Sequence, residues 1–240
     1  MRAATSVLEA HGGVAGWLCL KHVDVDEQNA PHDVEREVAL LRTTRHDHLA
    51  TLLAAFTETP DAFTTVHHLA MPLYPVGLAA VLDAPRFAPH TPPFAADAAD
   101  AWEKLLAGET YVSFVGAAMR QLLDAVAYLH AAGIAHRDIK PANIFMTGRT
   151  QPRVLDFGIA RIRQAESLAQ RDDPQSRFHE LVGGSPYYMS PEQVRRLPVD
   201  RRVDVYALGV VLYELLTGQR PFAGNSLEEI AEAVVWMCSD

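Results

Sequence analysis

The sequence predicts an α+β fold, because segments of strand length occupy the first third of the chain and long amphipathic helices occupy the rest. Short apolar runs at 18–23, 49–56 and 63–69 have the length and composition of β-strands. Apolar residues recur at helical spacing over 112–129 and 203–216. A chain of 240 residues can bury the core of one large domain or of two smaller lobes.

The first third also contains one predicted helix. It follows the strand at 18–23, which carries a single Lys, Lys21. Pro31 suits the first turn of a helix. Three apolar residues then recur at i, i+4 and i+7: Val34, Val38 and Leu41.

Two longer helices are predicted in the second part of the chain. The first has apolar residues at alternating steps of three and four from Val112 to Leu129, and Gly133 favours its end. The second covers 203–216 and ends at Gly218. Both are apolar enough to be buried in a core.

Shorter elements complete the prediction. Residues 144–146 and 153–155 bracket a Thr-Gly-Arg turn and are predicted to form a β-hairpin. Ser226 and Glu229 have the spacing of a capping box and are predicted to begin a last helix.

Two segments differ from the rest in composition. Residues 84–108 are rich in Pro, Ala and Asp and are predicted to form an inserted surface loop with a short helix near 97–106. The polar stretch between Asp156 and Glu192 is expected to be mobile.

Composition disfavours several classes of partner. Lys and Arg total 21 against 30 Asp and Glu, and the resulting net charge of −9 argues against nucleic acid or anionic lipid. Cys19 and Cys238 provide no disulfide framework and suit a reducing intracellular compartment, cytoplasmic or nuclear. The apolar run 12–20 is interpreted as structure, because no small-residue cleavage site follows it. No stretch is expected to be long enough to span a membrane.

One run of residues carries the chemistry. The segment 136–143 (HRDIKPAN) contains an acid, Asp138, a cation, Lys140, and an amide, Asn143. A second acid, Asp156, follows thirteen residues after the amide. Metal-assisted phosphoryl transfer needs such a set, with one carboxylate for the incoming hydroxyl and amide and carboxylate oxygens for Mg²⁺.

These residues resemble the catalytic loop and metal-binding turn of serine/threonine protein kinases. The resemblance implies that Asp138 orients the substrate hydroxyl and accepts its proton, while Lys140 steadies the transferred phosphoryl group. It also implies that Asn143 and Asp156 hold Mg²⁺ and, together with Lys140, bind ATP.

The resemblance also implies an ion pair between Lys21 and Glu37 at the nucleotide. A single Lys on a strand usually extends to water. In protein kinases, however, such a Lys contacts the ATP phosphates and pairs with an acid on the next helix. Glu37 fits the helix phase of that acid better than Glu35, which is the alternative.

The resemblance continues beyond the catalytic run. Residues 184–192 (GSPYYMSPE) resemble the substrate-binding loop and the Ala-Pro-Glu end of a kinase activation segment, with Ser190 in place of Ala. Asp204 resembles the acid that anchors the backbone of the catalytic loop. The alternative for Asp204 is an exposed acid at a helix N-terminus.

Arg137 normally pairs with a phosphate on the activation segment of such enzymes. The corresponding position is near Glu180, and we expect Glu180 to supply a fixed negative charge to Arg137. A phosphate on Ser176 is the rival hypothesis.

The implied fold is bilobal, with a small β-rich N-lobe over 1–73 and a larger α-helical C-lobe over 74–240. Kinases place a glycine-rich hairpin about twenty residues before the nucleotide-binding Lys. That position is at or before Met1, so the hairpin is expected to be missing. The glycines at 11–16 are predicted to lie in a turn between two strands. The final C-lobe helices, with the Arg that partners Glu192, are also expected to be missing.

The predicted function is Mg²⁺-dependent transfer of the ATP γ-phosphoryl group to Ser or Thr of a protein substrate. The alternative is a pseudokinase or scaffold that keeps the fold without turnover. A regulatory subunit is compatible with the resemblance. The subfamily is open, because residues 71–78 resemble cyclin-dependent-kinase-like enzymes and 184–192 resemble NIMA-related kinases.

Overall fold

The computed structural model covers the whole chain, and it is described for a defined set of residues: 6–9, 17–25, 31–59, 65–72, 74, 76–82, 111–147, 151–157, 161–162, 186–195, 197–222, 224 and 226–237. The predicted insert and its short helix lie outside these residues. So does most of the stretch between Asp156 and Glu192, for which mobility was predicted.

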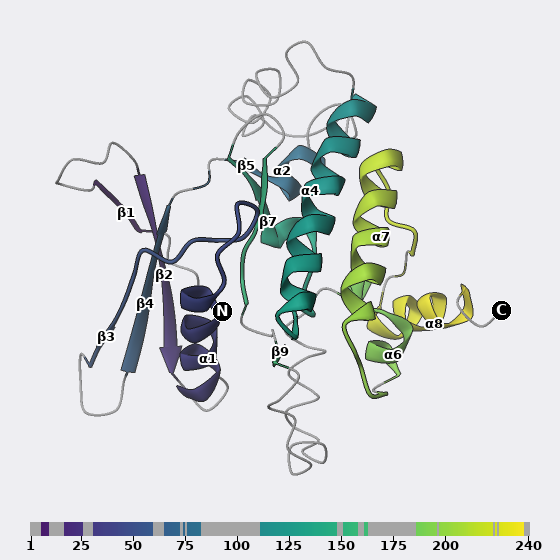
Figure 1. Cartoon of the computed structure of the whole chain (residues 1–240). Coiled ribbons are helices and arrows are strands. Elements are labelled where there is room, and N and C mark those ends of the chain that lie inside the picture. Colours follow the sequence, from purple (N-terminus) through teal and green to yellow (C-terminus); the bar gives the residue numbers. More distant parts are fainter. Residues whose placement is uncertain are drawn as a thin grey trace.

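An antiparallel sheet with one helix forms the first part of the structure (Figure 1). Its strand order is β1 (Ser6–Glu9), β2 (Trp17–Val25), β4 (Thr65–Pro72) and β3 (Ala54–Glu58). The helix α1 (Pro31–Thr43) lies beside the sheet (Figure 1).

The strand register explains where Lys21 lies. Lys21 is opposite Leu69, and Leu69 is opposite Ala55. Paired residues share one face of a sheet, and Leu69 is fully buried. The ammonium of Lys21 bonds to a side chain of α1, so the helix lies against this same face.

The predicted strand 49–56 is partly wrong. The strand in this region, β3, begins only at Ala54. Leu49 is fully buried and makes an isolated parallel bridge with Val154, while the Ala50 N–H donates to the Val154 carbonyl at 2.9 Å. Leu49 and Ala50 are thus buried in a connecting segment, which a short apolar run cannot distinguish from a buried strand.

The predicted turn at 11–16 lies outside the described residues. The two strands that flank it, β1 and β2, are antiparallel neighbours with Glu9 opposite Trp17. This pairing is what a turn between them requires.

Helices dominate the second part of the structure (Figure 1). They are α2 (Leu78–Leu82), α4 (Tyr111–Ala131), α6 (Pro191–Val194), α7 (Arg202–Thr217) and α8 (Leu227–Met237), with short 3-10 helices η1 (Pro141–Asn143) and η3 (Pro186–Tyr188). Short strands lie between them: β5 (Val76–Gly77), β6 (Ile134–Ala135), β7 (Ile144–Met146), β8 (Pro152–Val154) and β9 (Arg161–Ile162).

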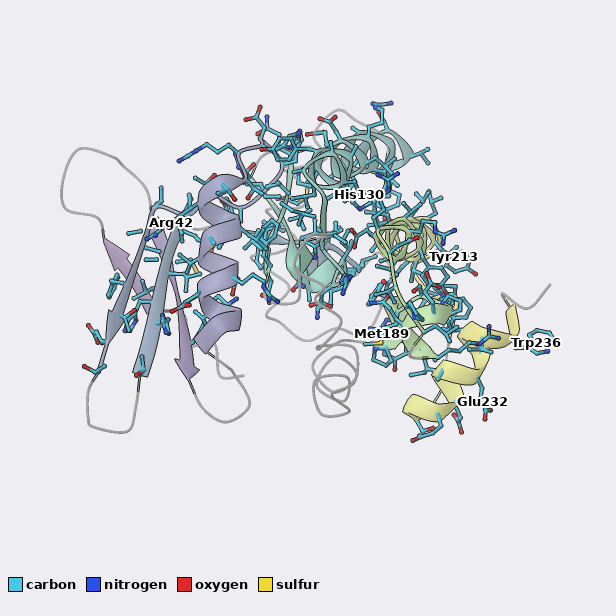
Figure 2. All side chains as sticks on the ribbon, turned by 60° about the horizontal axis from the view of Figure 1, so that its bottom comes forward. Arg42, His130, Met189, Tyr213, Glu232 and Trp236 are labelled. Atoms are coloured by element: carbon cyan, nitrogen blue, oxygen red, sulfur yellow. The ribbon has the colours of Figure 1, made fainter. Side chains whose placement is uncertain are left out.

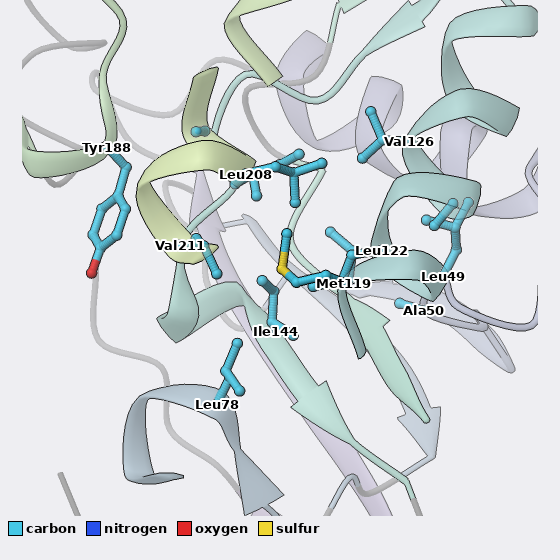
Figure 3. Close-up of a cluster of buried hydrophobic side chains, with 14 of the residues drawn as sticks. Leu49, Ala50, Leu78, Met119, Leu122, Val126, Ile144, Tyr188, Leu208 and Val211 are labelled. Atoms are coloured by element: carbon cyan, nitrogen blue, oxygen red, sulfur yellow. The ribbon is translucent and has the colours of Figure 1, made fainter. Parts of the chain in front are cut away.

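The core of this part is built on α4 and α7, which pack side by side (Figure 1). Figure 3 shows Met119, Leu122 and Val126 of α4 close to Leu208 and Val211 of α7. The ends follow the sequence prediction, because both terminal glycines adopt the left-handed conformation: Gly133 at φ 77° and Gly218 at φ 72°.

Helix α4 corrects the expectation that no stretch is long enough to span a membrane. By length and composition alone, its 21 residues could cross one. In this structure nine of those residues are buried in the core with α7. A core helix meets the same criterion, so the finding by itself assigns no membrane role.

The structure confirms the α+β class and the two lobes. The β-sheet with α1 forms one lobe, the helices form the other, and β5 and β7 lie between them (Figure 1). The hairpin β7–β8 and the helix α8 also occur where the sequence predicts them, and the Glu229 N–H donates to Ser226 Oγ at 3.2 Å. The exact lobe boundary after residue 73 stays a prediction.

Candidate active site

The catalytic loop is anchored by Asp204 in the first turn of α7. Asp204 is 0% exposed. Its Oδ2 accepts the backbone N–H of His136 at 2.9 Å, and its Oδ1 accepts that of Arg137 at 2.7 Å. The alternative of an exposed acid is therefore wrong, and Asp204 has the anchoring position that the resemblance implies.

A third group contacts this anchor. His130 lies on the side of α4 that faces α7 (Figure 2), and its Nε2 is 2.7 Å from Asp204 Oδ2. No role is predicted for His130 from the sequence, because it lies in the last turn of an amphipathic helix. A buried carboxylate is costly unless hydrogen bonds compensate its charge, and this one receives three.

His136 supports the loop from inside. It is fully buried, its Nδ1 accepts the Asp138 N–H at 3.3 Å, and its Nε2 is 3.1 Å from the Leu155 carbonyl. A backbone N–H needs an acceptor and a carbonyl needs a donor, so in this arrangement the ring proton is on Nε2. The imidazole thus connects the catalytic loop to the segment before Asp156.

Asp138, Lys140 and Asn143 form one hydrogen-bonded cluster. Lys140 Nζ is 2.9 Å from Asp138 Oδ1 and 2.8 Å from Oδ2. Asn143 Nδ2 donates to Asp138 Oδ2 and to the Asp138 carbonyl, both at 2.9 Å. Burial raises the pKa of the Asp138 carboxyl, and the Lys140 ammonium opposes that rise.

Lys21, Glu37 and Asp156 form a second cluster. Lys21 Nζ is 2.8 Å from Glu37 Oε1, 3.0 Å from Glu37 Oε2 and 3.0 Å from Asp156 Oδ1. Glu37 is 4% exposed, whereas Glu35 is exposed. The predicted Lys21–Glu37 ion pair is present, and Glu37 rather than Glu35 is the partner.

The electrostatics of the second cluster favour a bound cation. Burial lowers the pKa of Lys21, but Glu37 and Asp156 outweigh it and the net pKa is raised. Burial also raises the pKa of Glu37, against the opposing effect of Lys21. Two carboxylates share one ammonium, so the cluster carries an uncompensated negative charge when all three groups are ionised.

The β7–β8 hairpin places the two predicted metal ligands, Asn143 and Asp156, at its open end. Ile144 of β7 is opposite Val154 of β8, and the Leu155 N–H donates to the Asn143 carbonyl at 2.8 Å. The ladder thus continues to Asn143 and Leu155, and Asp156 is the next residue. Asn143 and Asp156 are thirteen positions apart in the sequence because this hairpin, Ile144 to Val154, lies between them.

The residues present fit a magnesium site. Asn143 turns its amide nitrogen to Asp138, so its amide oxygen points away from that carboxylate. Asp156 adds a carboxylate oxygen, and both are the hard oxygen ligands that Mg²⁺ prefers. No group of three or more His, Cys, Asp or Glu suited to a metal occurs among the described residues, as expected when one ligand is an amide.

The conformation of Asp156 is fixed by its neighbours. Asp156 has φ 65°, and it and Arg137 (φ 68°) are the non-glycine residues with positive φ in the described part of the chain. Phe157 is buried, with its ring centroid 5.1 Å from that of His136. Such strained residues persist where surrounding contacts hold them, often at functional sites.

Part of the predicted substrate-binding segment is described. Tyr188 donates its hydroxyl to Glu214 of α7 at 2.5 Å, and Arg220 Nε is 3.3 Å from the other oxygen of Glu214. Burial raises the pKa of the Tyr188 phenol, with the bond to Glu214 adding to the rise. These bonds connect η3 to α7. Glu180 and Ser176, the two hypothetical partners of Arg137, lie outside the described residues.

Comparison with known proteins decides the family. A sequence model described as "Protein kinase domain" matches residues 11–238. The chain belongs to the protein kinase domain family. This agrees with the two lobes, the anchored loop and the Lys21–Glu37 pair described above.

Several curated relatives are serine/threonine-protein kinases by name. PkaA of Streptomyces coelicolor is 43% identical over 113 residues, which cover 46% of this chain and 19% of that protein. Pkn3 of Myxococcus xanthus is 46% identical over 110 residues, or 44% of this chain and 19% of that protein. PknB of Mycobacterium leprae is 46% identical over 109 residues, or 45% and 16%. The matched part thus spans less than a fifth of each relative, and these matches leave the predicted subfamily untested.

Proposed function

We propose that this protein transfers the γ-phosphoryl group of ATP to a Ser or Thr hydroxyl of a protein substrate, with Mg²⁺. The observation that carries the proposal is that Lys21 Nζ forms salt bridges with two carboxylates, Glu37 at 2.8 Å and Asp156 at 3.0 Å. These residues come from three separate segments, and a purely structural ion pair would need only one carboxylate.

Each residue of the site has a role in this proposal. Lys21, held by Glu37, contacts the ATP phosphates, and Asn143 and Asp156 are the residues that would hold Mg²⁺. When bound, Mg²⁺ neutralises charge on the phosphates. Lys140 steadies the phosphoryl group in transfer. Asp138 orients the substrate hydroxyl and accepts its proton.

The electrostatics of Asp138 favour proton acceptance. Burial raises the pKa of its carboxyl, which makes the carboxylate a stronger proton acceptor than that of an exposed Asp, and the Lys140 ammonium opposes the rise. The names of the relatives, all serine/threonine-protein kinases, support Ser or Thr as the acceptor.

The test compares Asp138→Asn with the parent in binding and in turnover. Asn keeps the shape of Asp138 and can still accept hydrogen bonds, but it is no base. We expect phosphorylation of a generic basic protein to fall by about 10²–10⁴-fold. Affinity for Mg-ATP, measured by calorimetry, should change by less than about threefold, because the proposed phosphate contacts come from other residues.

Asp47→Asn is the matched control, since Asp47 is exposed in the turn after α1. It should retain both parental values. Mg-ATP binding without Asp138-dependent turnover would contradict the proposal and support a non-catalytic scaffold instead.

A further inference from the structure

Gln193, on the short helix α6, bonds to two distant segments at once. Its Oε1 accepts the backbone N–H of Ser190 at 3.0 Å and the Ser190 hydroxyl at 3.2 Å. Its Nε2 donates to the carbonyl oxygen of Arg137 at 3.2 Å, 56 residues away. One side chain therefore joins the end of the substrate-binding segment to the catalytic loop.

Chemistry fixes the orientation of this amide. A backbone N–H can only donate, so the atom of Gln193 that faces Ser190 is the oxygen. A backbone carbonyl can only accept, so the atom that faces Arg137 is the nitrogen. The two constraints agree. If the amide of Gln193 were turned over, it would lose its hydrogen bonds to the backbone of Ser190 and to that of Arg137.

The bond to Arg137 controls one peptide plane. In the peptide group between Arg137 and Asp138, the carbonyl accepts a hydrogen bond from Gln193 Nε2. The N–H of the same peptide donates to His136 Nδ1 at 3.3 Å. Arg137 has φ 68°, a conformation that an L-residue adopts only at a cost. Asp204 holds the N–H of Arg137, so Gln193 supplies the bond on the other side of this strained residue.

The plane of that peptide sets the direction of the Asp138 side chain, because the peptide ends at the Asp138 Cα. A rotation of this plane would move the carboxylate away from Lys140 and Asn143, which hold it at 2.8–2.9 Å. Proton transfer is sensitive to displacements of about 1 Å, which can cost about 10²-fold in rate.

We infer that Gln193 is a positioning residue for Asp138: it holds the Arg137–Asp138 peptide in the orientation that Asp138 needs to accept the substrate proton. The inference rests on the proposed function for its catalytic consequence. It also gives Ser190 a role, because the buried Ser190 hydroxyl and N–H orient the Gln193 amide. An Ala at position 190 would keep only the N–H.

Gln193→Glu separates positioning from helix capping. Glu suits the same capping-box position on α6, so its carboxylate can still accept the Ser190 N–H. It has no donor for the Arg137 carbonyl and would face it with a second oxygen. Gln121→Glu is the matched control, because Gln121 Nε2 also donates to a backbone carbonyl, that of Ala117 at 3.1 Å, within α4.

The first readout is hydrogen exchange of the full chain, which needs no activity. In Gln193→Glu we expect the backbone amides of residues 136–138 to exchange about tenfold faster, with Tm close to that of Gln121→Glu. Unchanged exchange at these amides would overturn the inference and leave Gln193 as a cap of α6 only.

The second readout is kinetic. In Gln193→Glu we expect kcat to fall about tenfold or more, with KM for ATP within about twofold, because Gln193 contacts none of the proposed ATP-binding residues. A parental kcat in Gln193→Glu would overturn the inference. So would a lower kcat together with a Tm well below that of Gln121→Glu, because general destabilisation would then explain the loss. If the parent itself shows no turnover, the proposed function fails while the exchange experiment still decides the role of Gln193.

Discussion

The two charged clusters of the site are built in different ways. The first cluster joins three separate segments: Lys21 lies on β2, Glu37 on α1 and Asp156 just after β8. Glu37 is 16 residues from Lys21 in the sequence, and Asp156 is 135 residues from it. Asp138, Lys140 and Asn143 come from one short segment, in which Asn143 is five positions after Asp138. The first cluster forms only when sheet, helix and hairpin are assembled. The hydrogen bonds of the second cluster all lie within the loop, whose backbone Asp204 and Gln193 hold from outside. The first therefore reports on the arrangement of the lobes, and the second on local geometry.

The largest expected effect comes from Lys21→Met. It leaves Glu37 and Asp156 facing each other without the ammonium, and breaking such a buried pair costs about 3 kcal/mol in the free energy of unfolding. Phosphorylation should fall by more than about 10²-fold. Denaturant unfolding and a phosphotransfer assay measure the two quantities.

Lys140→Met is the matched comparison for the local cluster. Asn143 still donates to Asp138 in this variant, so the loss of stability should be about 1 kcal/mol. If Lys21→Met and Lys140→Met lowered the free energy of unfolding by the same amount, the proposed distinction between an assembled and a local cluster would be contradicted.

A smaller effect is expected from Asp204→Asn, which tests how local the second cluster is. Asn offers one oxygen where Asp offers two, so the N–H of His136 or of Arg137 loses its acceptor at a cost of about 1–3 kcal/mol. We expect a fall in kcat of about tenfold with little change in Mg-ATP affinity.

Asp200→Asn, an exposed acid just before α7, is its control and should behave as the parent does in unfolding and in steady-state kinetics. A parental kcat in Asp204→Asn would show that the loop keeps its shape without the α7 anchor.

The smallest effect is a shift of the pH–rate profile in Lys140→Gln. Asp138 must be ionised to accept a proton, so activity is lost as pH falls through its pKa. Burial raises this pKa and Lys140 lowers it. Removing the positive charge should therefore raise the pKa of Asp138 and move the acid limb of kcat to higher pH.

Lys140→Arg keeps the charge and should keep the acid limb in place. The measurement is kcat across the acid limb for the parent and both variants. An acid limb that moved to lower pH, or did not move in Lys140→Gln, would contradict the effect assigned to Lys140.

The sequence predicts much of the assembled cluster because helix phase is readable. Val34, Glu37 and Leu41 lie at i, i+3 and i+7, and all three are buried on one face of α1. Glu35 lies off this face and is exposed. The acid that the resemblance selects therefore also lies on the buried face of the helix and faces Lys21.

The sequence predicts less where the structure depends on contacts between residues far apart in the chain. His130 bonds to a carboxylate on another helix, and Gln193 bonds to a carbonyl 56 residues away. Neither residue breaks the local pattern, so no periodicity or spacing indicates its role. The strand predicted at 49–56 begins only at Ala54 for a related reason: burial against another segment, as for Leu49 and Ala50, and pairing in a sheet favour the same residues.

The segment that follows α1 has a mechanical consequence. Although it belongs to the first part of the chain, it is fastened to the helical lobe: the Arg45 N–H donates to the Tyr128 hydroxyl at 3.1 Å, and Ala50 and Val154 share the bond described above. One end of α1 is thus a pivot, and Glu37 lies on a lever arm about 10 Å long, at 1.5 Å per residue from Thr44.

A swing of about 10° about that pivot would displace Glu37 by about 2 Å over such an arm. That displacement is enough to separate its carboxylate from Lys21, which it contacts at 2.8 Å. The Asp138 cluster lies in the helical lobe, to which this end of α1 is bonded, and would stay in place in such a movement. The fold would therefore allow the proposed nucleotide-binding pair to separate while the proposed base keeps its position.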